Sequence, residues 1–173
     1  MSNDEWPKSL PSWTETFLRV WCLVWLLGWQ GGFAFYSGVV VPVGSDVLGS
    51  ELEQGWVTRS VTPWLNGLGG VGIASSFVAL KLTRWSHSKS TYGRWSKRLA
   101  YGIAGYLTLS LLALIWVHGQ VDLQLDPRSR QVVDYDAFYQ VHRIYLILST
   151  TQWLTTIVLA GGLIHGWTQR STS

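Results

Sequence analysis

The chain has 173 residues, of which 47% are hydrophobic and only 13% are charged, and its formal net charge is +3. Because soluble domains carry about 25% charged residues, this composition argues against an ordinary soluble protein. The single cysteine, Cys22, excludes an internal disulfide.

Four long stretches contain no Asp, Glu, Lys or Arg. Each is near or above the roughly 20 residues that a helix needs to cross a bilayer. The sequence therefore predicts an all-α integral membrane four-helix bundle that forms a single membrane domain over residues 1–173. The uncharged runs are 20–45, 60–80, 99–121 and 144–169, and the predicted spans are about 17–42, 59–83, 99–121 and 138–167.

The first span is rich in glycine. Gly28 and Gly32 form a GxxxG pair, a spacing that lets another helix backbone approach closely, so we expect a helix crossing there. Pro42 is expected to end the helix or kink its last turn. Residues 43–58 are then expected to form a short exterior loop.

Small residues lie on every side of the second span, which predicts that this helix is packed on two faces. In the third span, His118 falls on the same side as Leu107, Leu111 and Leu114, near the outer end. After it, a DPRS turn between VDLQL and QVVDY predicts a small exterior hairpin. The small residues of the second span are Gly67, Gly69, Gly70, Gly72, Ala74, Ser75 and Ser76.

The fourth span carries a polar stripe. At about 100° per residue, its polar side chains fall within an arc of roughly 100°. An unpaired amide or hydroxyl that faces lipid costs several kcal/mol, so we expect the stripe to face the other three helices. The polar stripe is His142, Tyr145, Ser149, Gln152 and Thr156, and Phe138, Trp153 and Ala160 share its arc. The residues expected to point elsewhere, toward lipid, are Leu148, Leu154, Ile157, Val158 and Leu159.

Basic residues divide unevenly between the two ends of the predicted bundle. If both termini lie on one side, that side holds nine Lys and Arg residues and the other side four. The positive-inside rule then places both termini and the 81–98 loop in the cytoplasm. The basic loop is explained by this topology and by contact with anionic lipid headgroups, so no nucleic-acid partner is expected.

Two histidines are the candidate ligands. His118 and His142 meet at the outer face and, with Asp122, are candidates for a divalent metal site. The same pair, or His87 with His165 at the inner side, is a candidate for axial ligation of haem b. The outer pair is disfavoured for haem, because His118 shares its arc with leucines whereas His142 lies on the polar stripe. The leading interpretation of His142 is a structural hydrogen bond, with no cofactor.

Three segments, GGFAFYSGVVVPVG, VTPWLNGLGGVG and FYQVHRIYLILSTTQW, resemble a small four-helix bacterial membrane family of unknown function, which has related eukaryotic transmembrane proteins. The chain is also loosely similar to the membrane domains of copper-resistance proteins. The resemblance implies a four-helix fold in the bacterial inner (plasma) membrane and no established activity. The matching positions are Gly31, Gly32, Pro42, Phe138, His142 and Ser149, and the match at Gln152 and Trp153 is partial.

None of the four spans contains an internal Asp or Glu, which argues against an ion-coupled pump. The leading hypothesis is a non-enzymatic scaffold, partner or assembly subunit that contacts the lipid bilayer and other membrane subunits or a second copy of itself. One alternative is a small transporter or metal-handling protein that uses the polar stripe. Another is a haem b-binding electron-transfer protein.

Overall fold

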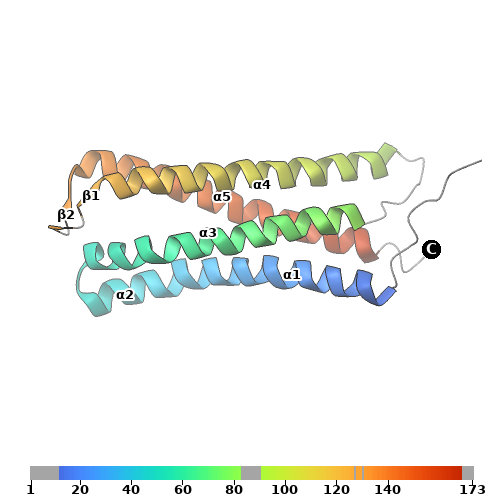
Figure 1. Cartoon of the computed structure of the whole chain (residues 1–173), viewed down its shortest axis with the longest axis horizontal. Helices are drawn as coiled ribbons and strands as arrows, with labels where there is room; N and C mark the ends of the chain where they lie inside the picture. Colours follow the sequence, from blue (N-terminus) through green and yellow to red (C-terminus); the bar gives the residue numbers. More distant parts are fainter. Residues whose placement is uncertain (1–11, 83–90, 127, 130, 169–173) are drawn as a thin grey trace, which may run out of the picture.

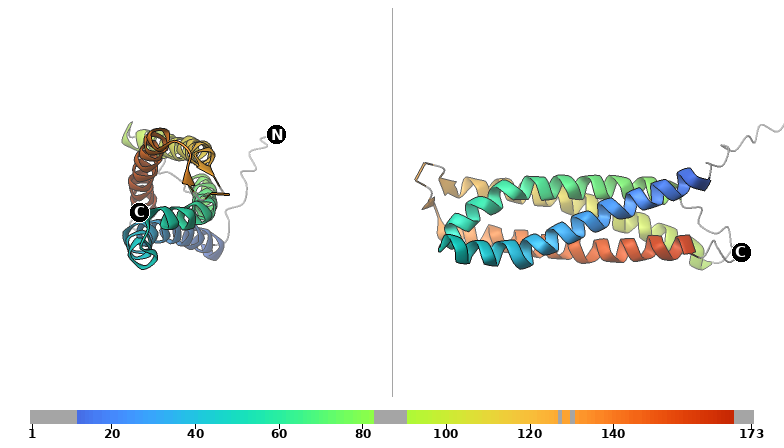
Figure 2. Two further views of the ribbon diagram at one scale, coloured as in Figure 1. Left: turned by 90° about the vertical axis from the view of Figure 1, so that its left-hand side faces the viewer. Right: turned by 90° about the horizontal axis from the view of Figure 1, so that it is seen from below.

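In the computed structural model, which describes residues 12–82, 91–126, 128–129 and 131–168, four long helical segments run up and down a bundle (Figure 1). The first segment joins α1 (Ser12–Phe35), the π-helical turn η1 (Tyr36–Val40) and α2 (Val41–Leu48), and the others are α3 (Glu51–Leu82), α4 (Thr91–Leu123) and α5 (Tyr135–Thr168). Seen along the bundle, the segments occupy the corners of a rough square (Figure 2). The prediction of an all-α, four-helix architecture is confirmed.

Three of the four segments are long and apolar enough to cross a membrane, namely Trp13–Leu48, Arg98–Leu123 and Tyr135–His165. α3 has sufficient length, at 32 residues. Its glycines, its serines and Asn66 lower its mean hydropathy, and it does not meet the same criterion. Three of the four predicted spans are thus candidate membrane spans by length and apolar composition, and the chain is a candidate multi-pass membrane protein.

The first segment continues through Pro42, so the expectation that this proline ends the helix is wrong. The turn η1 comes directly before α2, in which Pro42 occupies the first turn. A π turn shifts the hydrogen-bond register of the helix, and proline lacks the N–H that the old register would require. The helix ends at Gly49, whose φ of 65° is the left-handed conformation that glycine adopts without strain.

The predicted exterior loop at 43–58 is also wrong. Only two residues, Gly49 and Ser50, separate α2 from α3. The Ser50 hydroxyl accepts a hydrogen bond from the Glu53 backbone N–H at 3.3 Å, which caps the first turn of α3. The segment counted as loop is therefore helical on both sides of a tight turn.

The predicted hairpin between the last two helices is present. β1 (Leu125–Asp126) pairs antiparallel with β2 (Gln131–Val132). The Asp126 carboxylate accepts hydrogen bonds from the Ser129 hydroxyl at 2.7 Å and the Arg128 backbone N–H at 2.9 Å. These bonds, the Ser129 bond first, hold the pKa of Asp126 below its usual value. Asp134 then caps α5 by accepting the Ala137 N–H at 3.1 Å.

α1 packs on α3 by placing large side chains over small ones. A Cβ added at Gly69 of α3 would lie 3.0 Å from Nε1 of Trp29, which is buried. A Cβ added at Gly28 or Gly32 would meet nothing within 4 Å. The expected crossing at Gly28 and Gly32 is therefore wrong, whereas α3 does pack on two faces, against α1 and α4. One small surface per crossing suffices, and α3 provides it.

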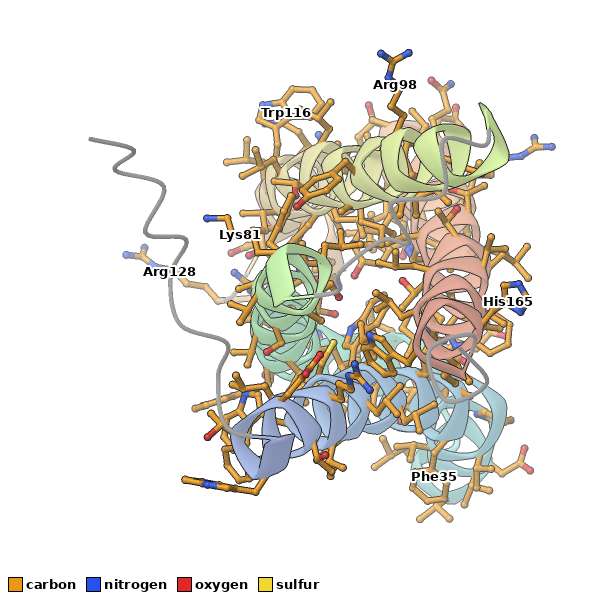
Figure 3. All side chains as sticks on the ribbon, turned by 90° about the vertical axis from the view of Figure 1, so that its right-hand side faces the viewer. Phe35, Lys81, Arg98, Trp116, Arg128 and His165 are labelled. Atoms are coloured by element: carbon orange, nitrogen blue, oxygen red, sulfur yellow. The ribbon has the colours of Figure 1, made fainter. Side chains whose placement is uncertain are left out.

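The outside of the bundle is apolar and its inside holds polar side chains. Figure 3 shows Phe35 and Trp116 pointing away from the helices, and other large apolar side chains are exposed on every segment. This distribution suits a lipid environment, where apolar surface carries no penalty and polar groups need protein partners. The buried polar residues are Gln30, Gln54, Thr62, Ser75, Ser76, Ser110, Ser149, Gln152 and Thr156.

α5 turns its polar stripe inward over the middle of its length. Gln152 and Thr156 are both 0% exposed. The expectation that Leu159 faces lipid is wrong, because this side chain is only 2% exposed. Leu159 follows Gln152 by seven residues and Thr156 by three, and both spacings return to the same helix face.

The two glycine environments give the first testable prediction. Gly28→Ala is expected to keep or raise the free energy of unfolding by up to about 1 kcal/mol, because alanine is the better helix former and its methyl group meets open space. Gly69→Ala gains the same propensity but crowds Trp29, so it should be less stable than Gly28→Ala by about 1–3 kcal/mol. Thermal unfolding of both variants in one detergent measures this. Equal stability would mean that α1 and α3 do not pack at this site.

The adjacent residues Val158 and Leu159 on α5 give the second testable prediction. Leu159→Ala should lower the free energy of unfolding by about 2–5 kcal/mol, because it leaves a cavity in the core. Val158→Ala is the control, since Val158 is 60% exposed and trimming it leaves room that lipid or detergent fills. Chemical unfolding of the two variants compares them directly. A larger loss in Val158→Ala would show that the face of α5 is misassigned.

Candidate functional site

A pair of hydrogen bonds joins α1 to α5 near the middle of the bundle. The Gln30 amide donates to the Trp153 carbonyl oxygen at 3.0 Å, and the Trp153 indole N–H donates to the Gln30 carbonyl oxygen at 3.3 Å. The contacts between α1 and α5 are sparser than those between the other neighbouring helices. We call this pair the Gln30–Trp153 link. It closes the side of the bundle where packing is thinnest.

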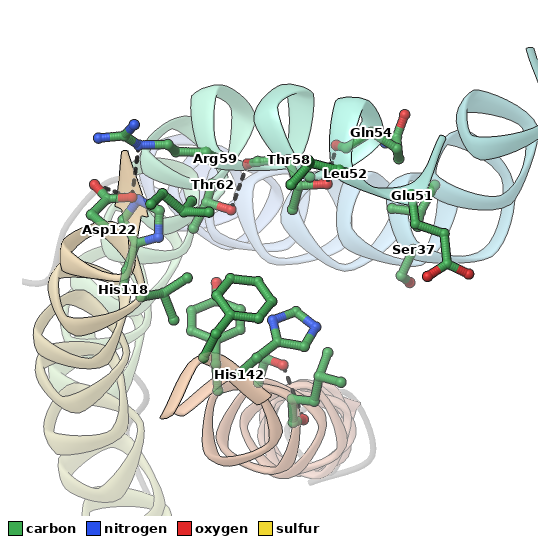
Figure 4. Close-up of a pocket in the computed structure, with 18 of the residues that line it drawn as sticks. Ser37, Glu51, Leu52, Gln54, Thr58, Arg59, Thr62, His118, Asp122 and His142 are labelled. Atoms are coloured by element: carbon green, nitrogen blue, oxygen red, sulfur yellow. Dashed lines mark hydrogen bonds and ion pairs between the residues drawn. The ribbon is translucent and has the colours of Figure 1, made fainter. Parts of the chain in front are cut away.

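A cavity of about 640 Å³ lies between the Gln30–Trp153 link and the hairpin end of the bundle (Figure 4). It is lined by the first helical segment from Phe33 onward, by the N-terminal half of α3, by the C-terminal end of α4 and by the N-terminal part of α5. Ser149, one turn before Trp153, is the last residue of α5 to line it. The volume falls within the roughly 300–1,000 Å³ of small-molecule sites.

Hydroxyl groups along one face of α3 organise one wall of the cavity. The Tyr36 hydroxyl donates to the Thr58 hydroxyl at 3.0 Å, and Thr58 donates in turn to the Gln54 carbonyl oxygen at 3.0 Å. One turn further on, Thr62 donates to the Thr58 carbonyl oxygen at 2.8 Å, and the Tyr145 side chain hydrogen-bonds Thr62. Tyrosines from η1 and α5 are thus both held by α3, on opposite sides of the cavity.

One ion pair spans α3 and α4 at the cavity. Arg59 Nε lies 2.8 Å from Asp122 Oδ1 (Figure 4). The Arg59 guanidinium also lies over the Trp56 ring, 5.1 Å from its centroid. His118 Nε2 lies 3.9 Å from the other oxygen of Asp122. Because both members of the Arg59–Asp122 pair remain partly exposed, its role is to neutralise and position Arg59 more than to stabilise the fold.

Both candidate histidines line this cavity, His118 from the leucine side of α4 and His142 from the polar stripe of α5. The leucine side of α4, which carries His118, is the inner side of the helix, so the two histidines share one cavity although they lie on different kinds of helix face. The His118 ring lies 6.4 Å from the Tyr145 ring. His142 stacks flat on Phe138, with ring centroids 5.6 Å apart and an interplanar angle of 5°.

The metal and haem hypotheses remain predictions. Within the described ranges, no group of three or more His, Cys, Asp or Glu side chains is placed to hold a metal ion. His118 adjoins Asp122, while the contact partner of His142 is an aromatic ring. For the inner pair, His87 lies outside the described residues, and His165 is exposed and points away from the bundle (Figure 3).

Several lining residues were not singled out from the sequence. Gln54, Thr58 and Thr62 recur every four residues, a spacing that places three polar groups on one helix face. This spacing can be read from the sequence, but Gln54 and Thr58 fall within the predicted exterior loop, whereas Thr62 falls within the predicted second span. Tyr36 was passed over because the helix was expected to end nearby, at Pro42.

Comparison with known proteins places the chain in no group, since no family model, curated protein or solved structure matches it. The resemblance drawn from the sequence segments therefore stays a prediction.

The hydroxyl of Tyr145 gives the third prediction. Tyr145→Phe should lower the free energy of unfolding by about 1 kcal/mol, because it removes a hydrogen bond to Thr62 between α5 and α3. Tyr139→Phe, on the exposed neighbouring turn, loses a hydroxyl from the same helix and should change stability far less. Unfolding of the two variants side by side is the measurement. An equal effect would remove Tyr145 from the contact between α5 and α3.

Proposed function

We propose that the protein is a bacterial inner-membrane protein in which all four helical segments cross the bilayer. The residues of α3 support counting this helix as a span as well. It has no charged residue from 60 to 80, and its outward face is apolar, with Trp64 78% exposed. Gly69 and Gly72 are turned toward α1 and Gly70 toward α4, so part of the small-residue content that lowers the average hydropathy lies on the packed faces. The other exposed apolar residues of α3 are Val57, Leu68, Val71 and Val78.

We further propose that both termini are cytoplasmic. α1 begins and α5 ends at the same end of the bundle (Figure 1), and the topology predicted from the sequence assigns nine of the thirteen Lys and Arg residues to that side. The positive-inside rule assigns such an end to the cytoplasm. The cavity, at the opposite end, would then open on the periplasmic side.

The function that this geometry supports best is the binding of a small organic molecule with an apolar body, as a carrier or sensor would bind it. The observation that carries the proposal is the 640 Å³ cavity, which combines aromatic walls with a few fixed polar groups and lies next to the Gln30–Trp153 link. Such a combination is typical of ligand sites. It favours the transporter-like alternative over a purely structural role.

A neutral fluorescent probe, N-phenyl-1-naphthylamine, tests this binding function in the purified full chain. We expect a saturable component of one probe molecule per chain above the linear uptake by micelles. Ser149→Trp, which fills the inner end of the cavity, should abolish that component, whereas Thr150→Trp on the adjacent exposed position should retain it.

Circular dichroism and gel filtration establish that both tryptophan variants are folded. If Ser149→Trp is unfolded, Ser149→Leu replaces it, with a partial loss of probe binding expected. Absence of a saturable component in the wild type, or its survival in the folded Ser149 variants, would contradict the proposal.

A scaffold, partner or assembly subunit is the second candidate, and one observation favours it. Gly28 and Gly32, at GxxxG spacing on the first segment, have no neighbour within 4 Å of an added Cβ, so this surface is open to another helix. Gly28→Leu combined with Gly32→Leu should then shorten the list of cross-linked species in native membranes while the monomer stays folded. An unchanged cross-linking pattern would count against this role.

A further inference from the structure

The cavity is rich in aromatic rings. Six Phe and Tyr residues line it, namely Phe33, Tyr36, Tyr135, Phe138, Tyr139 and Tyr145. On α5, Phe138 meets Tyr139 edge-on at 5.8 Å and stacks on His142. The faces of such rings carry negative electrostatic potential, which attracts cations most strongly where water is partly excluded.

The formal charges on the wall are also biased toward negative. With histidine counted as neutral, three charged residues line the cavity, and they are Glu51, Arg59 and Asp122. Arg59 is already engaged by Asp122 at 2.8 Å and by the Trp56 ring. Glu51 therefore adds a carboxylate that no cation balances among the described lining residues.

The charges of the sequence segments at the hairpin end of the bundle, where the cavity lies, reinforce this negative bias. The two sequence segments that form the hairpin end, 43–59 and 122–143, contain seven of the ten acidic residues of the chain and four arginines. Their net charge is −3, in a protein whose total is +3. A concentration of one charge sign around an opening raises the local concentration of oppositely charged solutes.

We propose that the cavity binds an organic cation with an apolar body, such as a quaternary or protonated amine or a phosphonium ion. This inference rests on the proposed binding function and names the ligand class for the same site. The apolar body would occupy the space between α2 and α5, its charge would lie against the ring faces of Phe138 and Tyr145, and Glu51 would supply the counter-charge. An anion of the same shape meets the same apolar walls but is repelled by Glu51 and by the rings.

Two probes of one shape and opposite charge make the test. Tetraphenylphosphonium and tetraphenylborate are each titrated into the purified full chain in an uncharged detergent, with empty micelles as the blank. We expect the phosphonium ion to bind saturably and at least about tenfold more tightly than the borate, a ratio that several cation–π contacts and one carboxylate together supply.

Substitutions in the cavity wall test which side chains cause the preference for the phosphonium ion over the borate. Glu51→Gln and Phe138→Leu should each weaken phosphonium binding about threefold to tenfold, since one removes a charge and the other removes a ring face while keeping an apolar side chain. Asp136→Asn is the matched control, an exposed acid at the same end that does not line the cavity. At about 0.15 M salt, where the Debye length is about 8 Å, it should leave binding unchanged.

The outcomes separate the two proposals. Equal or tighter binding of the borate, or an equal effect of Asp136→Asn and Glu51→Gln, would overturn the cation inference. In that case saturable uptake of the neutral naphthylamine, lost in Ser149→Trp, would leave the cavity as a ligand site of another class. If neither charged probe nor the neutral probe binds saturably, both proposals fail.

Discussion

The reciprocal hydrogen bonds between Gln30 and Trp153 join α1 and α5, the two neighbouring helices that pack most sparsely. Each residue donates its side-chain N–H to the backbone carbonyl oxygen of the other, so α1 and α5 are held at one level of the bundle. In hydrocarbon these donors have no water to return to, and opening the link would leave them unpaired. Beyond the link, toward the hairpin, residues of both the first helical segment and α5 line the cavity.

The same constraint explains why the bundle is polar inside and apolar outside. Gln152 and Thr156 continue the buried polar seam on α5, where Gln152 donates to the Leu107 carbonyl oxygen at 3.5 Å and Thr156 donates to the Gln152 carbonyl oxygen at 2.9 Å. Toward the end of the bundle where α1 begins and α5 ends, an apolar core that includes Leu159 and Leu163 follows these buried polar residues. The inward face of α5 thus packs in an apolar core at one end of the bundle and lines the cavity at the other end. The two ends can be altered separately, because their side chains are not shared.

Much of the fold was predictable from charge alone, since uncharged runs of sufficient length mark the helices and the polar stripe indicates which side of α5 faces inward. What escaped prediction depends on packing or on local backbone geometry. Pro42 argues for a helix end only if the helix keeps its normal register, and the π turn changes that register. Gly28 and Gly32 have the spacing of a crossing, but Gly69 accepts Trp29 instead. Leu159 was misassigned despite a spacing that pointed inward.

The site was harder to foresee, because a cavity arises from the divergence of helices and no single segment records it. His118, His142 and Asp122 were recognised as neighbours at the outer end, but their association with Tyr36, Thr58 and Glu51 depends on residues 43–58 being helical. Once that segment is helical, its polar residues line the cavity instead of a solvated loop. A single error in a helix boundary thus concealed part of the wall, namely the lining residues between 43 and 58.

The central claim is that α5 hides its polar stripe within the bundle and shows lipid its apolar side. Spin labels introduced singly from 152 to 160 in Cys22→Ser protein, reconstituted in bilayers, measure this through their accessibility to dissolved oxygen. The account predicts a period of about 3.6 residues, with minima at Gln152, Thr156 and Leu159 and maxima at Leu154 and Val158. High oxygen accessibility at Gln152 and Thr156, or a pattern without a helical period, would contradict it.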